Sequence, residues 1–294
     1  MKDKRALAAL IAAMSIFGTI GIFRQWIPLP SATVALCRSV IGALFLLAVL
    51  LTRRKKPDFS ALRRVRLPLL LSGICLGANW LLLFEAYRFT TVATATLCYY
   101  MAPMLLVLLS PVLLKERLTL RRVLALVLAL AGMVPVSGSL EGQSDGGNNA
   151  LGVLFGLGAA VLYASVVIMN KLLADVPSLE RTALQLGAAG FTVLPYALLT
   201  MGELSVKPLS LGLLFIVGVF HTGFAYNMYF GAVSRLKGQT VAILSYIDPA
   251  SAIFLSALFL SQTPTALEAL GAVLIIGAAF VGEVSFKKKA AVSE

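Results

Sequence analysis

Charged residues are scarce in this 294-residue sequence: Asp, Glu, Lys and Arg together make up 13% of it, about half their share of a typical soluble domain. Hydrophobic residues make up 59% of the chain. So few charges cannot cover a water-exposed surface of this size, which argues against a soluble globular protein. Apolar stretches long enough to cross a lipid bilayer recur along the whole chain, and no polar segment remains that could form a separate domain.

Residues that hold metals or build catalytic centres are also few. Histidine occurs once, at His221, so a multi-His metal site is excluded, and the HExxH motif is absent. The cysteines lie inside apolar runs and are expected to be small buried thiols rather than metal ligands or disulfide partners: Cys37, Cys75 and Cys98. The GxxxxGK[ST] motif of nucleotide-binding loops is missing as well. No metal and no cofactor are therefore expected.

The apolar runs predict an all-α membrane protein with ten transmembrane helices. Backbone groups in hydrocarbon must be hydrogen-bonded within their own segment, so each run is expected to be a helix. The predicted spans are 6–23, 31–51, 67–87, 92–114, 121–137, 150–172, 182–201, 209–231, 239–260 and 266–284.

The net charge of +12 is distributed in a way that indicates membrane topology rather than nucleic-acid binding. Of the 25 Lys and Arg residues, 21 fall in alternate breaks between the spans if the N-terminus is cytoplasmic, and the breaks on the other side hold three. The remaining one, Arg38, lies within the second span. Because positive residues collect on the cytoplasmic side, both termini are predicted to be cytoplasmic, in a bacterial inner membrane.

An internal repeat divides the sequence into two halves. At an offset of 146 residues, segment 84–119 aligns with segment 230–265, and the matching pairs include polar, aromatic and proline residues: Phe84/Phe230, Ala86/Ala232, Thr94/Thr240, Tyr100/Tyr246, Pro103/Pro249, Ser110/Ser256 and Thr119/Thr265. The predicted organisation is a first five-helix repeat at 1–138, an outer glycine-rich loop at 139–149, a second five-helix repeat at 150–286 and a basic cytoplasmic tail at 287–294. Five helices per repeat is an odd number, so the second copy is expected to be inverted in the membrane, an arrangement used by transporters.

Three segments carry a resemblance to a known family. They are LCRSVIGALFLL at 36–47, FEAYRFTTVATATLCYYMAPMLLVLLSPVLLKERLT at 84–119, and GAVSRLKGQTVAILSYIDPASAIFLSALFL at 231–260. In order and spacing they resemble the EamA branch of the drug/metabolite transporter superfamily. That resemblance implies ten helices in two inverted repeats, a central cavity, and transport of small metabolites or drugs, often outward. The sequence departs from the pattern after the ninth span, where Ser-Gln-Thr at 261–263 stands opposite Lys-Glu-Arg at 115–117.

Ionisable residues within the spans are the first candidates for function, because buried charge in a bilayer is costly and usually faces a cavity or a partner. Asp248 precedes Pro249 deep in the ninth span, where proline frees a backbone carbonyl, so the carboxylate is a candidate site for a proton or a cation. His221 of the eighth span could relay protons if it faces Asp248, although a lone histidine is more often a packed core residue. Glu85 could pair with Arg88 one turn away or reach Arg38, as an outer-gate ion pair or as a solvated helix end.

Polar and aromatic residues on equivalent helix faces are the candidates for substrate binding. Arg38 could anchor an anionic group or tie helices together, and Gln185 is its counterpart in the second half. Tyr99 and Ser245 share their helix faces with Ala102 and Asp248, respectively. The other candidates are Asn79, Trp80 and Tyr226; Tyr100, Tyr163 and Tyr246 could also contribute to aromatic walls.

These features predict a secondary transporter, most simply an exporter, that moves a small organic metabolite by alternating access through a central cavity. Because both an acid and a base are available, amino-acid-like zwitterions fit best and organic cations next. Coupling would come from protons or exchange, and the protein would act as a monomer or homodimer in the bilayer, without a nucleic-acid partner. The alternative is an intramembrane enzyme or a channel, but the sequence offers neither a nucleophile or metal constellation nor symmetric filter elements.

Overall fold

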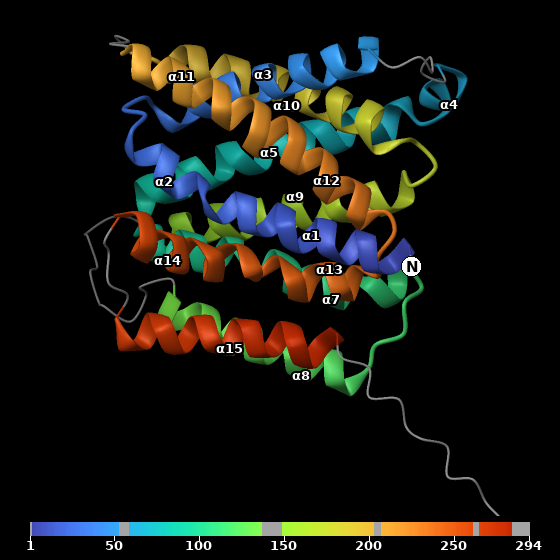
Figure 1. Cartoon of the computed structure of the whole chain (residues 1–294), viewed down its shortest axis with the longest axis vertical. Helices are drawn as coiled ribbons and strands as arrows, with labels where there is room; N and C mark the ends of the chain where they lie inside the picture. Colours follow the sequence, from blue (N-terminus) through green and yellow to red (C-terminus); the bar gives the residue numbers. More distant parts are fainter. Residues whose placement is uncertain (1, 53–58, 137–148, 203–206, 261–264, 284–294) are drawn as a thin grey trace, which may run out of the picture.

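The computed structural model describes residues 2–52, 59–136, 149–202, 207–260 and 265–283, and this part of the chain consists of helices joined by short connections, without a strand. The predicted all-α class is therefore confirmed. The glycine-rich loop at 139–149 (all but Asn149), the basic tail at 287–294 and Ser261–Thr263 lie outside the described residues. The helices, shown in Figure 1, are α1 (Lys2–Gly18), α2 (Ile20–Gln25), α3 (Ser31–Thr52), α4 (Phe59–Arg64), α5 (Arg66–Phe89), α6 (Val92–Tyr99), α7 (Ala102–Leu113), α8 (Leu120–Val136), α9 (Asn149–Leu172), α10 (Ser178–Thr200), α11 (Pro208–Ile216), the π-helix η2 (Val217–Phe224), α12 (Ala225–Val233), α13 (Gly238–Ser245), α14 (Ile247–Leu260) and α15 (Ala266–Glu283).

Eight stretches of described helix are long and apolar enough to cross a membrane. Four of them combine shorter helices that continue one another: α1 with α2, α6 with α7, α11 with η2 and α12, and α13 with α14. A shorter apolar helix covers Ala266–Gly282, within α15. α8 packs along α15, but α8 is not among the eight, so the count of ten spans stays a prediction.

The outward-facing surface of the bundle is apolar. Large hydrophobic side chains stand almost fully exposed along many helices, among them Leu51 (87%), Leu199 (86%) and Phe191 (77%). A water-soluble protein does not expose so much contiguous apolar surface. Together with the apolar helices, this surface identifies an integral membrane protein whose helices face lipid.

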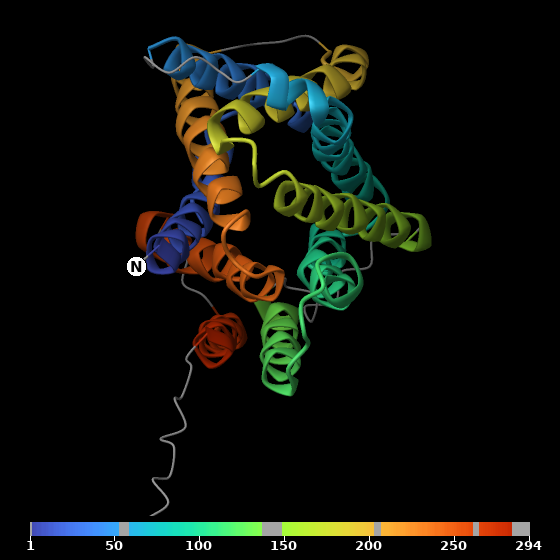
Figure 2. The same ribbon diagram turned by 90° about the vertical axis from the view of Figure 1, so that its right-hand side faces the viewer.

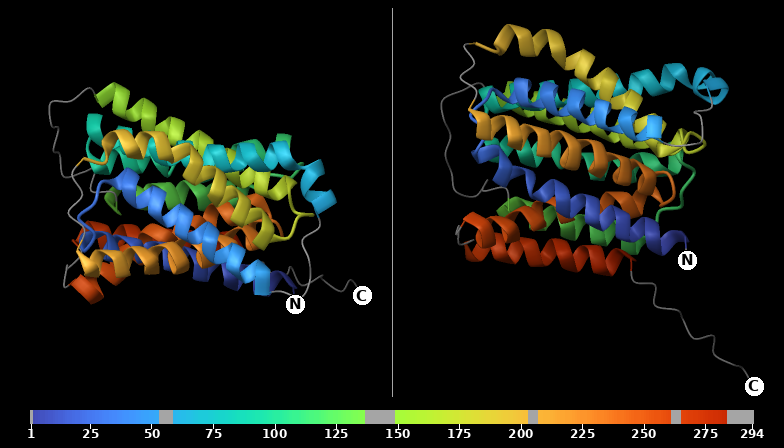
Figure 3. Two further views of the ribbon diagram at one scale, coloured as in Figure 1. Left: turned by 90° about the horizontal axis from the view of Figure 1, so that it is seen from above. Right: turned by 45° about the horizontal axis from the view of Figure 1, so that its top comes forward.

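The two ends of the bundle differ in charge. α1 begins and α15 ends at the same end (Figures 1 and 3), where α3, α7 and α9 also end. We call this the basic end, because the breaks predicted to be cytoplasmic lie there. One of the residues counted among its surface charges, Arg181, is in fact fully buried. α10 begins earlier than predicted, at Ser178, so Arg181 lies in its first turn and donates to the carbonyl oxygens of Asn170, Leu173 and Phe230.

The helix packing repeats between the halves. α9 packs on α5, α6 and α7, and its counterpart α1 packs in the same way on α12, α13 and α14. The contact of α5 with α10 likewise has its counterpart in that of η2 with α3. Three contacts join a predicted span to its own counterpart in the other half: the second span to the seventh through α3 and α10, the fourth to the ninth through α7 and α13, and the fifth to the tenth through α8 and α15. α1 starts at the end where α9 finishes (Figure 1), as expected of inverted copies.

Seen along the helices, the bundle is a ring with one projecting pair. Figure 2 shows most helices arranged around the centre, with α8 and α15 together outside the ring. Close approach depends on small residues: a Cβ added at Gly132 of α8 would lie 2.6 Å from the carbonyl oxygen of Gly271 in α15. The three cysteines are free thiols, and they are partly exposed rather than buried as predicted.

Candidate functional site

Two helix breaks meet at the centre of the bundle. The fourth predicted span is interrupted at Tyr100 and Met101, between α6 and α7, and the ninth predicted span is interrupted at Tyr246, between α13 and α14. Pro103 and Pro249 follow the breaks at equivalent positions, and a proline lacks the N–H that would continue the helix. The Tyr246 hydroxyl donates to the Tyr100 carbonyl oxygen at 2.9 Å, and the two rings lie 6.2 Å apart. The breaks therefore face each other across the two halves.

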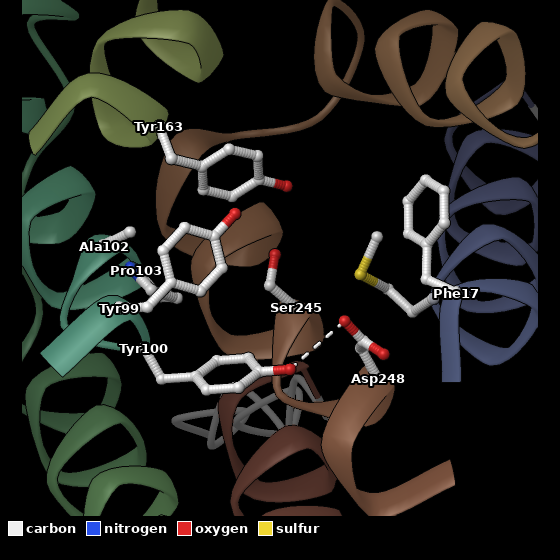
Figure 4. A pocket seen from close by; sticks show the side chains of 9 residues that line it. Phe17, Tyr99, Tyr100, Ala102, Pro103, Tyr163, Ser245 and Asp248 are labelled. Atoms are coloured by element: carbon white, nitrogen blue, oxygen red, sulfur yellow. Dashed lines mark hydrogen bonds between the residues drawn. The ribbon is translucent and has the colours of Figure 1, made fainter. Parts of the chain in front are cut away.

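A cavity of about 40 Å³ lies beside these breaks, and Figure 4 shows its lining. Helices of both halves contribute to it: α1, α6 and α7 from the first, and α9, α13 and α14 from the second. The lining residues are Met14, Phe17, Tyr99, Tyr100, Ala102, Pro103, Tyr163, Ser245 and Asp248. Pockets that hold organic ligands measure about 300–1,000 Å³, so this conformation is contracted around its centre.

Asp248 is the charged side chain of this lining. It lies in the first turn of α14, where the helix dipole stabilises a carboxylate. The Tyr100 hydroxyl donates to its Oδ2 at 3.2 Å (Figure 4). Within the described part of the chain, no basic group lies within ion-pair distance of it. The carboxylate can therefore accept a proton or bind a cationic group without displacing a protein partner.

Tyrosines form most of the opposite wall. Tyr99 and Tyr163 have ring centroids 5.6 Å apart, and the Tyr163 and Tyr229 hydroxyls lie at 3.0 Å. Ser245, which donates to the Val241 carbonyl oxygen at 2.8 Å, lies between this wall and Asp248 in Figure 4. Aromatic faces attract cations, so wall and carboxylate together present a surface suited to an amine. The predicted candidates Tyr99, Ser245 and Asp248 thus come together at one cavity.

Arg38 lies one aromatic layer away from that cavity. Its guanidinium stacks on Trp80, 4.6 Å from the ring centroid, and donates to the Tyr226 hydroxyl at 3.4 Å. Tyr226 in turn contacts Phe17, a cavity residue, at a centroid distance of 4.9 Å. The Arg38 Nε is enclosed and has no hydrogen-bond partner among the described residues. Arg38, Trp80 and Tyr226 therefore form a group of their own, with an unsatisfied donor that an anionic group can use.

Asn79 and Gln185 do not line the cavity. Both are fully buried: Asn79 donates to the Leu76 carbonyl oxygen at 2.7 Å, and Gln185 donates to the Ser72 hydroxyl at 2.6 Å. Gly73 and Gly77 let α10 come so close to α5 that these amides are enclosed between helices. Their Oδ1 and Oε1 atoms have no hydrogen-bond partner among the described residues.

His221 does not contact Asp248. Its Nε2 lies 2.6 Å from the Thr19 hydroxyl, and its ring packs edge-on against Phe23 at 4.7 Å. α1 passes between the two residues: Gly18 packs against the backbone of Asp248, and the next residue, Thr19, contacts His221. The proton pair that the sequence allowed between His221 and Asp248 is therefore not formed, because the break between α1 and α2 lies between the two residues.

Glu85 lies at the end of α5 opposite the basic end. Its carboxylate is 3.0 Å from Arg88 and also accepts a hydrogen bond from Tyr196 of α10. Of the two partners considered for Glu85, Arg88 is the one in contact.

Two lining residues of α1, Met14 and Phe17, were not among the sequence candidates. Neither residue type nor repeat pattern distinguishes them from other apolar residues. Among the described residues, no cluster of three His, Cys, Asp or Glu side chains is placed to hold a metal ion.

Comparison with known proteins identifies the family. The model of the EamA-like transporter family matches residues 4–138 and 150–282. The chain belongs to this family. The two matched segments correspond to the two repeats inferred from the sequence, and the organisation in two repeats is confirmed. As a member of the EamA-like family, the protein is a membrane transporter and not an enzyme.

Curated relatives align over almost the whole chain. An uncharacterized transporter, YxxF, of Bacillus subtilis is 28% identical over 92% of this chain and 86% of its own length. The threonine/homoserine exporter RhtA of Escherichia coli K12 is 25% identical over 97% of this chain and 93% of its own. A solved crystal structure superposes with a TM-score of 0.84, covering 95% of this chain and 97% of its own, and at 22% identity it shows the fold alone.

Proposed function

We propose that this EamA-like transporter exports a small amine-bearing metabolite, in the first place an amino-acid-like zwitterion, by alternating access. The observation that carries the proposal is Asp248: a carboxylate at a helix break, lining a cavity between the two halves, with no basic partner in the described part of the protein. An ammonium group is the natural complement of such a carboxylate. The tyrosine wall around it adds cation–π attraction.

The zwitterion is favoured over a simple amine because of Arg38. Its stacked guanidinium has an enclosed, unsatisfied Nε, which suits a carboxylate. Tyr226 and Phe17 separate it from the cavity, so both ends of a zwitterion are held at once only if these rings move when substrate enters. The relative named as a threonine/homoserine exporter supports the same substrate class. An organic cation is the second candidate, since the aromatic lining alone suits it.

The contracted cavity supports transport through a change of conformation rather than through an open channel. At about 40 Å³ it holds water but not a metabolite. Two inverted copies of one fold can exchange conformations, so that the cavity opens to either side in turn. We assign coupling to Asp248, which binds either a proton or the substrate amine; His221 and Glu85 lie apart from it and are weaker candidates.

The positive-inside rule supports a cytoplasmic location for the basic end, and hence for both termini. The bacterial relatives support a bacterial inner membrane.

Asp248→Asn tests the proposal, with Asp175→Asn as the matched control because Asp175 is exposed in the turn after α9. The purified proteins are screened by thermal unfolding against amino acids, including threonine and homoserine, their decarboxylated amines and quaternary ammonium compounds. A ligand present at 100 times its Kd stabilises the folded state by about 2.7 kcal/mol. We expect at least one amine to raise the unfolding temperature of the parent and of Asp175→Asn, and to lose most of this effect in Asp248→Asn.

The same ligand is then followed as radiolabelled counterflow in proteoliposomes. Asp248→Asn is expected to abolish flux while the protein remains folded in the membrane. An Asp248→Asn variant that binds and transports as the parent does would remove Asp248 from the site.

A further inference from the structure

The two equivalent helix starts in the two halves are capped differently. In the first half, Thr91 precedes α6, and its hydroxyl accepts a hydrogen bond from the Thr94 N–H at 3.1 Å, as an N-cap residue normally does. In the second half, the equivalent residue at the 146-residue offset is Lys237, which makes no side-chain cap to α13. The first N–H groups of α13 must therefore find an acceptor elsewhere.

Glu116 of the first half provides that acceptor. It follows α7, and its carboxylate oxygens accept from the N–H groups of Gly238 at 2.8 Å and Gln239 at 3.4 Å. The glycine leaves room for this approach, because a Cβ at Gly238 would lie 2.9 Å from Leu114 and 3.6 Å from both Glu116 oxygens. The equivalent position in the first half is Val92, whose side chain would occupy that space.

Lys171, at the end of α9, completes the contact. Its Nζ lies 3.4 Å from the Glu116 Oε1 and also donates to the carbonyl oxygen of Leu236, just before α13. The Lys171 and Glu116 side chains are only 12% and 13% exposed. Next to them, Arg122 of α8 donates to the Gln239 amide oxygen at 2.7 Å. Carboxylate, ammonium and helix start thus join α7 of the first half to α9 and α13 of the second, all at the basic end.

In the described part of the chain, the opposite end has no buried ion pair between the two halves. Glu85 contacts Tyr196 of the other half there, but its ion-pair partner is Arg88 of its own helix, which is 65% exposed. An exposed pair contributes little to stability. The residue equivalent to Glu116 is Gln262, which carries no charge and lies outside the described residues.

We propose that Glu116 is a gating residue that latches the transporter shut at the basic end and makes this conformation more stable than its inverted counterpart. Opening the basic end separates α7 from the start of α13, which breaks the ion pair and uncaps the helix together. Among the described residues, the other end has no buried ion pair of this kind, so the two states of alternating access are unequal in energy, and substrate binding must supply the difference. This inference rests on the alternating access proposed above but not on the identity of the substrate.

Accessibility of the cavity from each side tests the latch without any ligand. Ser245→Cys is introduced into the full chain, with the three partly exposed native cysteines replaced by serine: Cys37, Cys75 and Cys98. A membrane-impermeant maleimide is added from either side of sealed vesicles. Glu116→Gln is expected to raise the labelling rate from the basic end by about tenfold, as loss of a charge-assisted bond shifts an equilibrium.

Lys171→Gln, which removes the partner from the other half, is expected to change the rate in the same direction by a smaller factor. Glu268→Gln is the matched control. Glu268 also caps a helix start, by accepting from the Thr265 N–H at 2.7 Å, but it does so within its own half. Its labelling should equal that of the parent.

The latch would be overturned if Glu116→Gln were labelled at the same rate as the parent from both sides. It would equally be overturned if neither protein were labelled from either side. An increase in Glu268→Gln as large as in Glu116→Gln would overturn it too, because general loosening would then explain the result. If Asp248→Asn keeps full transport while Glu116→Gln shifts the labelling, the proposed substrate site fails and the latch stands.

Discussion

The contact between α5 and α10 offers a sharp test of the packing, because it joins the two halves through glycines. A Cβ added at Gly77 would lie 2.6 Å from the Ala189 carbonyl oxygen and 2.9 Å from the Thr192 Cβ. Ordinary contacts begin at 3.4 Å, so the helices would have to separate by several tenths of an ångström. Gly187, on the lipid-facing side of α10, has nothing within 4 Å of its added Cβ.

The same substitution is therefore expected to have opposite effects at the two sites. Alanine in place of glycine stabilises a helix interior by about 1 kcal/mol. At Gly187 this gain is realised in full. At Gly77 it is offset by overpacking, which costs about 1–3 kcal/mol. Gly77→Ala should thus be less stable than Gly187→Ala by about 2 kcal/mol.

The free energy of unfolding is measured in detergent by denaturant titration of both variants and the parent, under conditions where refolding is reversible. We expect the order Gly187→Ala, parent, Gly77→Ala, from most to least stable. Equal stabilities for the two variants, or a Gly77→Ala protein more stable than the parent, would refute the close approach of α5 and α10.

Two further substitutions concern arginines inside the bundle. Arg38→Lys should weaken binding of an amino acid by about tenfold, because the planar guanidinium and its stacking on Trp80 are lost, while the corresponding decarboxylated amine binds as before. Equal losses of affinity for both ligands would indicate that Arg38 has a structural role only. Arg181→Met should lower the free energy of unfolding by about 3 kcal/mol, because it leaves three buried carbonyl groups without their hydrogen-bond donor. Arg235 is exposed, so Arg235→Met should change the free energy of unfolding by less than about 0.5 kcal/mol. Similar values for the two variants would contradict the stabilising role of the Arg181 hydrogen bonds.

The sequence alone predicted where the helices lie and how the chain is organised. The hydropathy runs matched described helices to within a few residues, since a span depends only on local composition and length. The repeat was visible because Tyr100, Pro103 and their counterparts Tyr246 and Pro249 are uncommon enough in apolar segments to align by more than chance. The same pairs mark the helix breaks at which the cavity formed, and Asp248 was found through its proline neighbour.

What the side chains contact was decided by the tertiary structure. Asn79 and Gln185 appeared suited to a cavity, but the glycines of α5 bring α10 close enough to enclose them. His221 and Asp248 occupy neighbouring spans, yet α1, more than 200 residues away in sequence from Asp248, passes between them. Glu116 reads as one charge in a basic loop and gains its role only where it reaches α13. Hydropathy and repeats are properties of segments, whereas these contacts depend on how closely helices approach across the two halves, which only the packed bundle determines.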